Sequence, residues 1–407
     1  MQSDVPEKTK HNPNSRVLKG TLLAAGTLTV MASATISPAL PAITEAFTDT
    51  PNIDLLVSLL LTIPALFIAL GAPLAGVIVD RFGRKRLLVI AVTIYGFAGS
   101  AGFVLDGIWQ LLFSRALLGF SVAGVLTCVT TLIADYYKGQ ERSAFLGIQA
   151  AFAGLGGVIF LSAGGFLADV GWREPFLIYL LAFVILPFVI TALYEPQIPK
   201  QKNTVEMADL PEASLPIMLM AFIYTSMAIS QIAFYSIPLQ LPFYLDDLIN
   251  ASASQVGLAI AGLSLFYSIA SASYGWIDRH LNHLNTLMLG FATTGVGFVL
   301  ITTATGWLTI APGLVLSGFG LGLVIPNLNT WLANVVPVAL RGRALGGLTT
   351  ALFFGQFLSP FVVTPIRSVA GDGGVYAVIG IGLIVLASTG FLLRQRITLL
   401  TAAPSYE

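Results

Sequence analysis

With 407 residues and only 10% charged side chains, the chain is far less charged than soluble proteins, in which about a quarter of residues are charged. Its formal net charge of zero argues against a nucleic-acid partner. Cys128 is the single cysteine, which excludes an intrachain disulfide and a thiolate metal cluster. We expect no metal site at His280 and His283 because a third ligand is missing. The composition, with a mean hydropathy of +0.85, therefore predicts a chain that lies mostly in lipid.

Apolar runs of about 20 residues, separated by short polar or Gly- and Pro-containing segments, are typical of transmembrane helices. We predict such helices over residues 20–42, 54–79, 87–105, 109–136, 143–168, 175–194, 214–243, 255–277, 284–304, 307–335, 343–366 and 374–393. The first run follows a basic tail, as in a signal peptide, but it is longer than a signal h-region and is predicted to be retained. The sequence thus predicts an all-α membrane protein with twelve transmembrane helices.

One clear linker divides the chain. Residues 195–213 are rich in Pro, Lys, Gln and acids, and they separate two sets of six predicted helices. Gly275-Trp-Ile-Asp278-Arg279 in the second set repeats Gly76, Asp80 and Arg81 of the first set at an equivalent place. We therefore predict two pseudo-symmetric six-helix bundles. The predicted divisions are an N-terminal tail (1–19), a first bundle (20–194), the linker (195–213), a second bundle (214–393) and a C-terminal tail (394–407).

The distribution of cations predicts the orientation. An even number of helices places both termini on the same side of the membrane. Of the 20 Lys and Arg residues, all but Arg115, Arg173 and Arg367 fall on that side. Because cytoplasmic loops of membrane proteins carry an excess of Lys and Arg, we expect both termini to lie in the cytoplasm, in a multi-pass protein of a bacterial inner membrane.

The hairpin between the second and third predicted helices is the most distinctive stretch. It contains Gly, three residues, Asp-Arg, one residue, Gly and then basic residues, at positions Gly76, Asp80, Arg81, Gly83, Arg84, Lys85 and Arg86. This pattern resembles the corresponding loop of the major facilitator superfamily. The resemblance covers nearly all of the chain outside its ends. It implies a twelve-helix secondary transporter, built as a parallel duplication, that holds substrate between its halves and works by alternating access.

Asp80 is predicted to take part in a gate at this hairpin. An acid at a helix C-terminus is unfavourable, so Asp80 should seek a cation or a helix N-terminus. The resemblance implies that Asp80 contacts Arg341 and the start of the eleventh helix. It also implies that Arg84 pairs with Asp135. Such pairs would latch the two halves together. The alternative is that these cations only set the topology. The predicted gating and coupling residues are Gly76, Asp80, Arg81, Gly83, Arg84, Lys85, Arg115, Asp135 and Arg341.

Arg115 lies within the otherwise uncharged run Leu111–Gly119 of the fourth predicted helix. A cation inside a span is costly and usually faces a cavity or a partner. The run resembles the superfamily's fourth-helix motif, whose arginine is linked to proton coupling. However, the first predicted helix lacks the carboxylate that often pairs with that arginine in drug/proton antiporters. A structural role, a coupling role and a seat for an anionic substrate all stay open, as does snorkelling of the side chain to the membrane surface.

The fifth helix departs from the antiporter pattern. A Gly-Pro pair usually precedes the final Gly-Gly, but here Phe160-Leu161 stands before Gly164-Gly165. This departure weakens the resemblance to drug exporters specifically. By contrast, Gly171–Phe176 resembles the superfamily's junction between the fifth and sixth helices and supports membership in the superfamily.

Prolines are expected to break three helices. Pro38 and Pro41 are predicted to end the first helix, Pro238 and Pro242 the seventh, and Pro326 to interrupt the tenth. Broken helices matter because freed backbone groups can line a cavity.

The resemblance implies that the first, fourth, seventh and tenth helices line the substrate cavity. Polar and aromatic residues on these and neighbouring helices are candidates for substrate binding, namely Met31, Arg115, Thr127, Gln149, Tyr224, Gln231, Tyr235, Asn327, Trp331 and Gln356. A lining rich in aromatic rings and amides suits an amphipathic or aromatic solute. The alternatives are that each aromatic packs in the core and that Asn327 bonds a neighbouring helix.

No nucleotide-binding, metalloprotease or paired-acid motif is present, so we expect neither an enzyme nor a cofactor. The predicted function is secondary transport, with proton-coupled efflux of small amphipathic or aromatic compounds first. A facilitator or symporter for a small organic anion is the alternative, and a receptor or scaffold that moves nothing is a third reading. The expected partners are the small-molecule substrate, protons and the lipid bilayer, and the chain is expected to act as a monomer.

Overall fold

The computed structural model describes residues 15–196, 216–337 and 340–393, except for the side chains of Ser33, Ala34 and Asp80. Within these residues the chain forms only helices. The first half contains α1 (Arg16–Ala34), η1 (Ser37–Ala39), α2 (Leu40–Ala46), α3 (Ile53–Phe82), α4 (Arg84–Ser100), η2 (Ala101–Phe103), α5 (Ile108–Tyr136), α6 (Gly139–Ala168), η3 (Glu174–Leu180) and α7 (Leu181–Ala192). The second half contains α8 (Ile217–Ile249), α9 (Ala253–Ile277), α10 (His283–Thr302), α11 (Trp307–Val335) and α12 (Arg341–Leu392).

The described helices account for twelve membrane crossings. Eleven helical stretches are long and apolar enough to cross a membrane, and the last of them, α12, has 52 residues. A straight helix of that length would be about 78 Å long, more than twice the hydrocarbon core of about 30 Å. Gly371 breaks α12 with φ 73° and ψ −179°, so this helix crosses twice. The predicted all-α membrane fold with twelve spans is confirmed.

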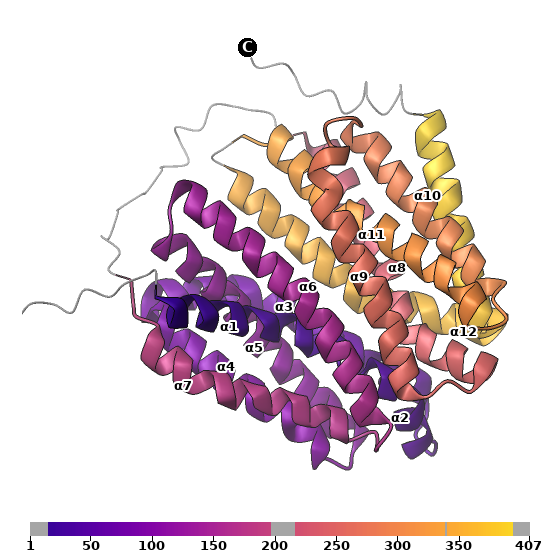
Figure 1. Cartoon of the computed structure of the whole chain (residues 1–407), viewed down its shortest axis with the longest axis horizontal. Coiled ribbons are helices and arrows are strands. Elements are labelled where there is room, and N and C mark those ends of the chain that lie inside the picture. The colour runs from indigo at the N-terminus through magenta and orange to yellow at the C-terminus, as the bar shows by residue number, and fades with distance from the viewer. Residues whose placement is uncertain (1–14, 197–215, 338–339, 394–407) are drawn as a thin grey trace, which may run out of the picture.

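The helices form two bundles, which we call the N half (α1–α7) and the C half (α8–α12), as Figure 1 shows. Within the N half, α5 packs against α3 and α4, and within the C half, α10 packs against α11 and α12. The halves meet mainly where α6 packs along α9 and where α3 packs along α12. Two helix pairs therefore form most of the interface between the halves.

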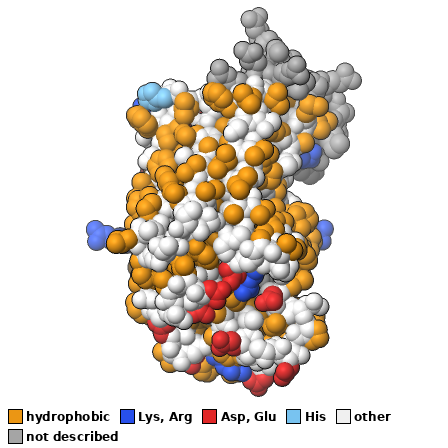
Figure 2. Space-filling view, turned by 90° about the vertical axis from the view of Figure 1, so that its right-hand side faces the viewer, with side chains coloured by type: hydrophobic (Ala, Val, Ile, Leu, Met, Phe, Trp, Pro, Cys, Tyr) orange, Lys and Arg blue, Asp and Glu red, His pale blue; other side chains and the backbone are white. Residues whose placement is uncertain are grey.

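Charged side chains distinguish the two ends of the bundle. We call the end that holds the α3–α4 hairpin the basic end. Its described cations include Arg16, Lys19, Arg84, Lys85, Arg279 and Arg341. The opposite, acidic end carries Glu45, Asp49, Asp54, Asp106, Asp169, Glu174, Asp246, Asp247 and Asp372, together with Arg173 and Arg367. Figure 2 shows apolar side chains around the middle of the molecule and acidic side chains gathered toward one end.

Two of the three predicted helix breaks are wrong. Helix α8 continues through Pro238 and Pro242, and α11 continues through Pro326. Helices in a membrane bundle tolerate proline because neighbouring groups satisfy the freed carbonyls. The first helix does break near its prolines: α1 ends at Ala34, before a 3₁₀ turn and the short helix α2.

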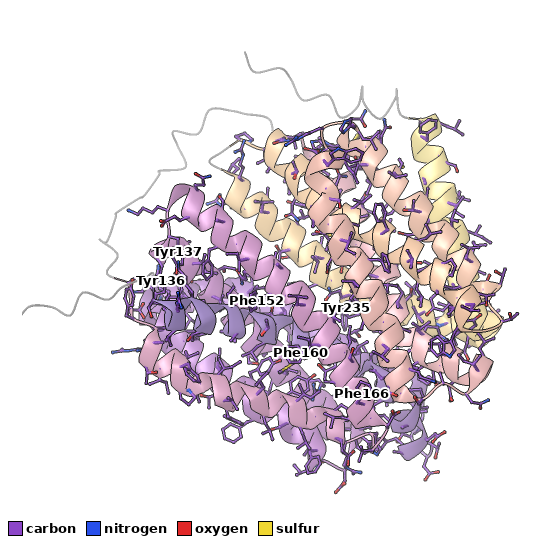
Figure 3. The ribbon with its side chains drawn as sticks, in the orientation of Figure 1. Tyr136, Tyr137, Phe152, Phe160, Phe166 and Tyr235 are labelled. Carbon is purple, nitrogen blue, oxygen red and sulfur yellow. The ribbon has the colours of Figure 1, made fainter. Side chains whose placement is uncertain are left out.

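The interface is closed at the acidic end and open toward the basic end. Over residues 139–152 of α6, Phe145 is the one buried residue, Gln149 is half-buried and the others are exposed. Nearer the acidic end the same helix buries Gly156, Gly157, Gly164, Gly165 and Leu161, and Leu161 belongs to the core of the C half. Figure 3 shows Phe152, Phe160 and Phe166 spaced along this helix. Apart from Phe145 and Gln149, residues 139–152 of α6 have no partner that buries them among the described residues, so the halves separate toward the basic end.

Candidate functional site

The α3–α4 hairpin is built around Gly83 and a carboxylate from the end of the N half. Glu195 accepts the backbone N–H groups of Arg84 at 2.7 Å and of Lys85 at 2.9 Å. The first N–H groups of a helix lack partners within it and favour negative charge, so this carboxylate caps α4. Gly83 has φ 93°, and a Cβ there would lie 2.8 Å from Oε1 of Glu195. Gly83 therefore turns the chain and leaves room for the cap.

The predicted pair of Arg84 and Asp135 is present, with 3.2 Å between Nε and Oδ2. Arg84 also donates to the carbonyl of Val79 at 3.4 Å. Both members of the ion pair belong to the N half, since it joins α4 to α5. The idea that this pair bridges the two halves is therefore wrong. Its physical effect is to hold the hairpin against the end of α5.

The other predicted latch pair cannot be placed. Asp80 lies in the last turn of α3, and its side chain is outside the described part of the structure. Arg341 begins α12 and donates from Nε to the carbonyl of Val336 at 3.1 Å. Arg81 is exposed, and within the described part of the chain Gly76 has no atom within 4 Å of where a Cβ would lie. A contact between Asp80 and Arg341 stays a prediction.

Arg115 is fully buried between helices of the N half. Its Nη2 donates to the carbonyl of Gly99 at 2.8 Å, and its guanidinium lies over the rings of Phe176 (4.7 Å) and Tyr179 (4.8 Å). Tyr179 in turn donates to the carbonyl of Ala32 in α1 at 3.0 Å. Since Arg115 is 0% exposed, the snorkelling alternative is wrong.

Two nitrogens of Arg115 lack a hydrogen-bond partner in the part of the chain that the structure describes. Within the described residues, its Nε and Nη1 are buried without a hydrogen bond. A buried charged group that is only partly satisfied costs free energy and usually has a specific purpose. The arginine touches α4 and η3 directly and reaches α1 through Tyr179, so it ties together three parts of the N half.

A pair of amides lies inside the C half. Nε2 of Gln356 donates to Oε1 of Gln231 at 3.0 Å, and both side chains are buried. One turn from Gln231, Tyr235 is 6% exposed and belongs to the hydrophobic cluster formed mainly by the N half. Nearer the basic end, the hydroxyl of Tyr224 donates to the carbonyl of Ala344 at 2.9 Å. Three of these predicted substrate residues, Tyr224, Gln231 and Tyr235, therefore lie along α8, and Gln356 lies on α12, which packs against α8.

Asn327 and Trp331 lie inside the C half. Asn327 is 0% exposed, and its Nδ2 donates to the carbonyl of His283 at 2.9 Å. Trp331 stacks on the ring of His283 with centroids 5.8 Å apart. Asp278 lies 3.4 Å from Nδ1 of His283 and accepts from the hydroxyl of Tyr274. The alternative of an asparagine that joins neighbouring helices describes this site better than a wall that faces the ligand.

The remaining substrate candidates lie on the N half. Met31 is buried in its core, and Thr127 is half-buried on α5. Gln149 of α6 lies against α1, where a Cβ on Gly26 would be 3.0 Å from its Nε2. Among described residues, no group of three or more His, Cys, Asp or Glu side chains could hold a metal ion.

Several candidate functional residues could not be recognised from the sequence. Glu195 was assigned to the linker, although an acid directly after an apolar helix is a candidate cap for the basic hairpin. At the acidic end, Ser37, Asp54, Asp169 and Arg367 all make contacts between the halves. The one signal for this group was Arg367 itself, which with Arg173 is one of two cations among the acids on the side opposite the basic loops.

Comparisons with known proteins agree with this architecture. A sequence profile of the Major Facilitator Superfamily matches residues 22–248 and 223–403. The chain is 25% identical to the tetracycline resistance protein, class C, of Escherichia coli, over 86% of this chain and 90% of that protein. It is 24% identical to the quinolone resistance protein NorA of Staphylococcus aureus (strain MRSA252), over 77% of this chain and 81% of that protein.

The fold is also similar to that of solved structures. One is a bacterial homolog of the human lysosomal transporter Spinster in an inward-facing, occupied conformation. It superposes with a TM-score of 0.80 at 15% identity and covers 97% of this chain and all of that one.

Proposed function

The chain belongs to the Major Facilitator Superfamily, and from that premise we propose that it exports small amphipathic or aromatic compounds in exchange for protons. The single observation that carries this proposal is the similarity, over most of its length, to two proteins named for drug resistance. The buried amide pair of Gln231 and Gln356 supports a site for such solutes, as do Tyr224 and Tyr235, which lie on α8 with Gln231.

Alternating access would move the solute across the membrane. The substrate would reach Gln231 and Gln356 while the basic end is open, and would leave after the acidic end has opened. Exposed residues along the first half of α6 and closed packing along its second half support this order of events. The inner-membrane location, the monomeric state and the absence of enzymatic activity belong to the same proposal.

We infer that the basic end faces the cytoplasm. The hairpin and the start of α12 place Arg84, Lys85, Arg341 and Arg343 at this end, and cytoplasmic loops are enriched in such cations. Both termini would then lie inside the cell. A protease added to sealed right-side-out vesicles should leave a C-terminal tag intact, and digestion of the tag would contradict this orientation.

Transport assays in reconstituted vesicles test the proposed export. Vesicles that contain the protein should accumulate ethidium or tetracycline when a pH gradient is imposed, and a protonophore should abolish the accumulation. Protein-free vesicles and the Asp80→Asn variant serve as controls. Accumulation that continues after the gradient collapses would contradict proton coupling. Failure to move any amphipathic cation or aromatic compound of a panel would contradict the substrate class.

Transport of a small organic anion is the second candidate. It is favoured by Nε and Nη1 of Arg115, which have no hydrogen-bond partner among the residues that the structure describes. Arg115→Lys keeps the charge but loses the planar guanidinium, and Arg115→Gln loses both. If Arg115 holds an anion, uptake of benzoate by vesicles at zero pH difference should fall in both variants and most in the glutamine one. Benzoate uptake that is absent in the unmodified protein would exclude this candidate.

A further inference from the structure

Three polar contacts join the halves at the acidic end. Ser37 donates from Oγ to the carbonyl of Pro238 at 2.5 Å. Asp54 pairs with Arg367, with 3.5 Å between Oδ1 and Nη1. The backbone N–H of Ser254 donates to Oδ1 of Asp169 at 3.1 Å. They connect three different pairs of elements, namely η1 with α8, α3 with α12 and α6 with α9, so they are spread across the interface.

Asp169 occupies a site that its own helix makes unfavourable. It follows the last residue of α6, where the partial negative charge of a helix C-terminus repels a carboxylate. Its carboxylate instead accepts an N–H from the first turn of α9, which favours negative charge. Ser252 and Gln255 of α9 form a capping box, so the C half satisfies part of this turn itself. Asp169, which belongs to the N half, accepts a further N–H of this turn, that of Ser254.

Arg367 connects a carboxylate of each half. Its Nε lies 2.6 Å from Oδ1 of Asp372 in the same half, and its guanidinium stacks on Phe243 at 4.0 Å. Gln240 also donates to Asp372. When the halves separate, Arg367 keeps these partners and, among its described contacts, loses the one to Asp54, whose side chain is 55% exposed and would return to water. The contact between the halves can therefore break without leaving a buried charge alone.

We propose that Asp54 and Asp169, bound by Arg367 and by the first turn of α9, form an acid-end latch. The latch holds the acidic end closed while the basic end is open, and it breaks before substrate leaves at the acidic end. This inference rests on the proposed alternating-access function and extends it to residues that carry no motif. Asp54 and Asp169 are positioning residues, since neither needs to touch the substrate.

The chain supplies a matched control for the latch. Asp106 and Arg173 form an ion pair at the same end, with 2.6 Å between Oδ1 and Nη2. Both residues belong to the N half, so their pair stays within one half when the two halves move. Asp106→Asn removes a carboxylate from the same end without weakening a contact between the halves.

Two cysteine reporters can follow the two ends separately. Leu239 is 1% exposed and belongs to the cluster formed mainly by the N half, so Leu239→Cys reports opening of the acidic end. Ser268 of α9 faces α6 at Gly154, and Ala272, one turn nearer the basic end, is exposed. Ala272→Cys therefore reports closing of the basic end. The native Cys128 is fully buried and gives a low background.

The experiment measures the rate at which a membrane-impermeant maleimide labels each reporter in purified protein in lipid nanodiscs. With Asp54→Asn and Asp169→Asn combined, labelling at position 239 should rise by roughly fivefold to 25-fold, because each contact shifts the equilibrium by up to about fivefold and the two effects multiply. Labelling at position 272 should fall, while Asp106→Asn should change neither rate.

Two results would overturn the latch. Unchanged labelling at position 239 in the double variant would show that these carboxylates do not hold the end closed. A rise at both positions would show general loosening of the fold rather than a change of state. The readout needs no substrate, so a shift of the two rates without ethidium or tetracycline transport would contradict the export proposal and leave the latch standing.

Discussion

The two ends of the α6–α9 interface differ in how closely the backbones approach. At the acidic end, a Cβ on Gly165 would lie 2.6 Å from the carbonyl oxygen of Ala253, and one on Gly257 would lie 2.6 Å from that of Leu161. Toward the basic end of the same helices, Gly147 and Gly275 have no atom of the described residues within 4 Å of a Cβ position. The same two helices pack backbone to backbone at one end and are apart at the other.

The α3–α12 interface shows the same difference. At its acidic end Asp54 meets Arg367, whereas at its basic end no described atom lies within 4 Å of where a Cβ on Gly76 or Gly346 would lie. Small residues allow close helix contacts, yet this structure does not use the glycines of the basic end in that way. We infer that they pack in the alternate state, in which the basic end is closed.

The largest effect is expected from Gly346→Leu. Gly346 lies two turns before Phe353, which packs against the cluster formed mainly by the N half, so both residues share a face. A leucine there fits the open state but would overpack the closed basic end. Overpacking costs about 1–3 kcal/mol, so transport should fall roughly tenfold or more, with no fall in the thermal unfolding midpoint.

The control for this variant lies on the same helix. Gly382 also has no atom within 4 Å and is exposed in the second crossing of α12. Gly382→Leu should leave transport unchanged. Normal transport by Gly346→Leu would show that position 346 does not approach the N half in either state. The basic end would then not close by packing its glycines.

Substitutions of one acid at each end should act in opposite directions. Asp80→Asn is expected to weaken the closed basic end, and Asp169→Asn the closed acidic end. Maleimide labelling at position 239 should therefore fall in the first variant and rise in the second, by up to about fivefold each. Both variants should transport more slowly while expression stays normal. Normal transport by Asp80→Asn would contradict a gate at the hairpin.

Close backbone packing at the acidic end is tested by two glycines of α9. Gly257→Ala places a Cβ against the carbonyl of Leu161, and the backbone cannot move as a side chain would. We expect a loss of about 1–3 kcal/mol in the free energy of unfolding. Gly262→Ala on the same helix meets open space and should stabilise it by up to about 1 kcal/mol. Equal unfolding midpoints would show that the packing at position 257 relaxes freely.

The smallest effect is expected from Glu195→Ala. Removing the cap of α4 should lower the free energy of unfolding by about 1 kcal/mol, as for other helix caps. Because the cap lies within the N half, labelling at positions 239 and 272 should stay the same. A change at either reporter would mean that the cap also affects the contact between the halves.

Much of the fold follows directly from the sequence. Lipid demands long apolar runs, so the twelve spans and the basic hairpin could be predicted from composition and charge alone. The pair of Arg84 and Asp135 could also be predicted, because a family motif fixes both positions. The predicted breaks at the prolines of α8 and α11 were wrong because neighbouring groups decide whether a proline breaks a helix, and hydropathy does not reveal those neighbours.

The contacts at the acidic end could not be predicted in this way. Asp54 and Arg367 lie far apart in the sequence and carry no shared pattern, and Asp169 bonds a backbone group rather than a side chain. The sequence left two alternatives open for Asn327, a wall facing the ligand or a bond to a neighbouring helix, and only the packing of α10 against α11 shows that it bonds His283. Pairings across an interface require the geometry of both partners.

The bond from Ser37 to Pro238 bears on how fast such a protein can work. Pro242 has no N–H, so the carbonyl of Pro238 lacks its usual partner within α8 and accepts the hydroxyl of Ser37 instead. If the acidic end opens, water can take the place of that hydroxyl, and the exchange of one hydrogen bond for another is nearly neutral in free energy. A contact of this kind therefore adds little to the free-energy difference between the state with the acidic end closed and the state with it open. A carrier whose two states are close in free energy spends little time trapped in one of them, which favours rapid turnover.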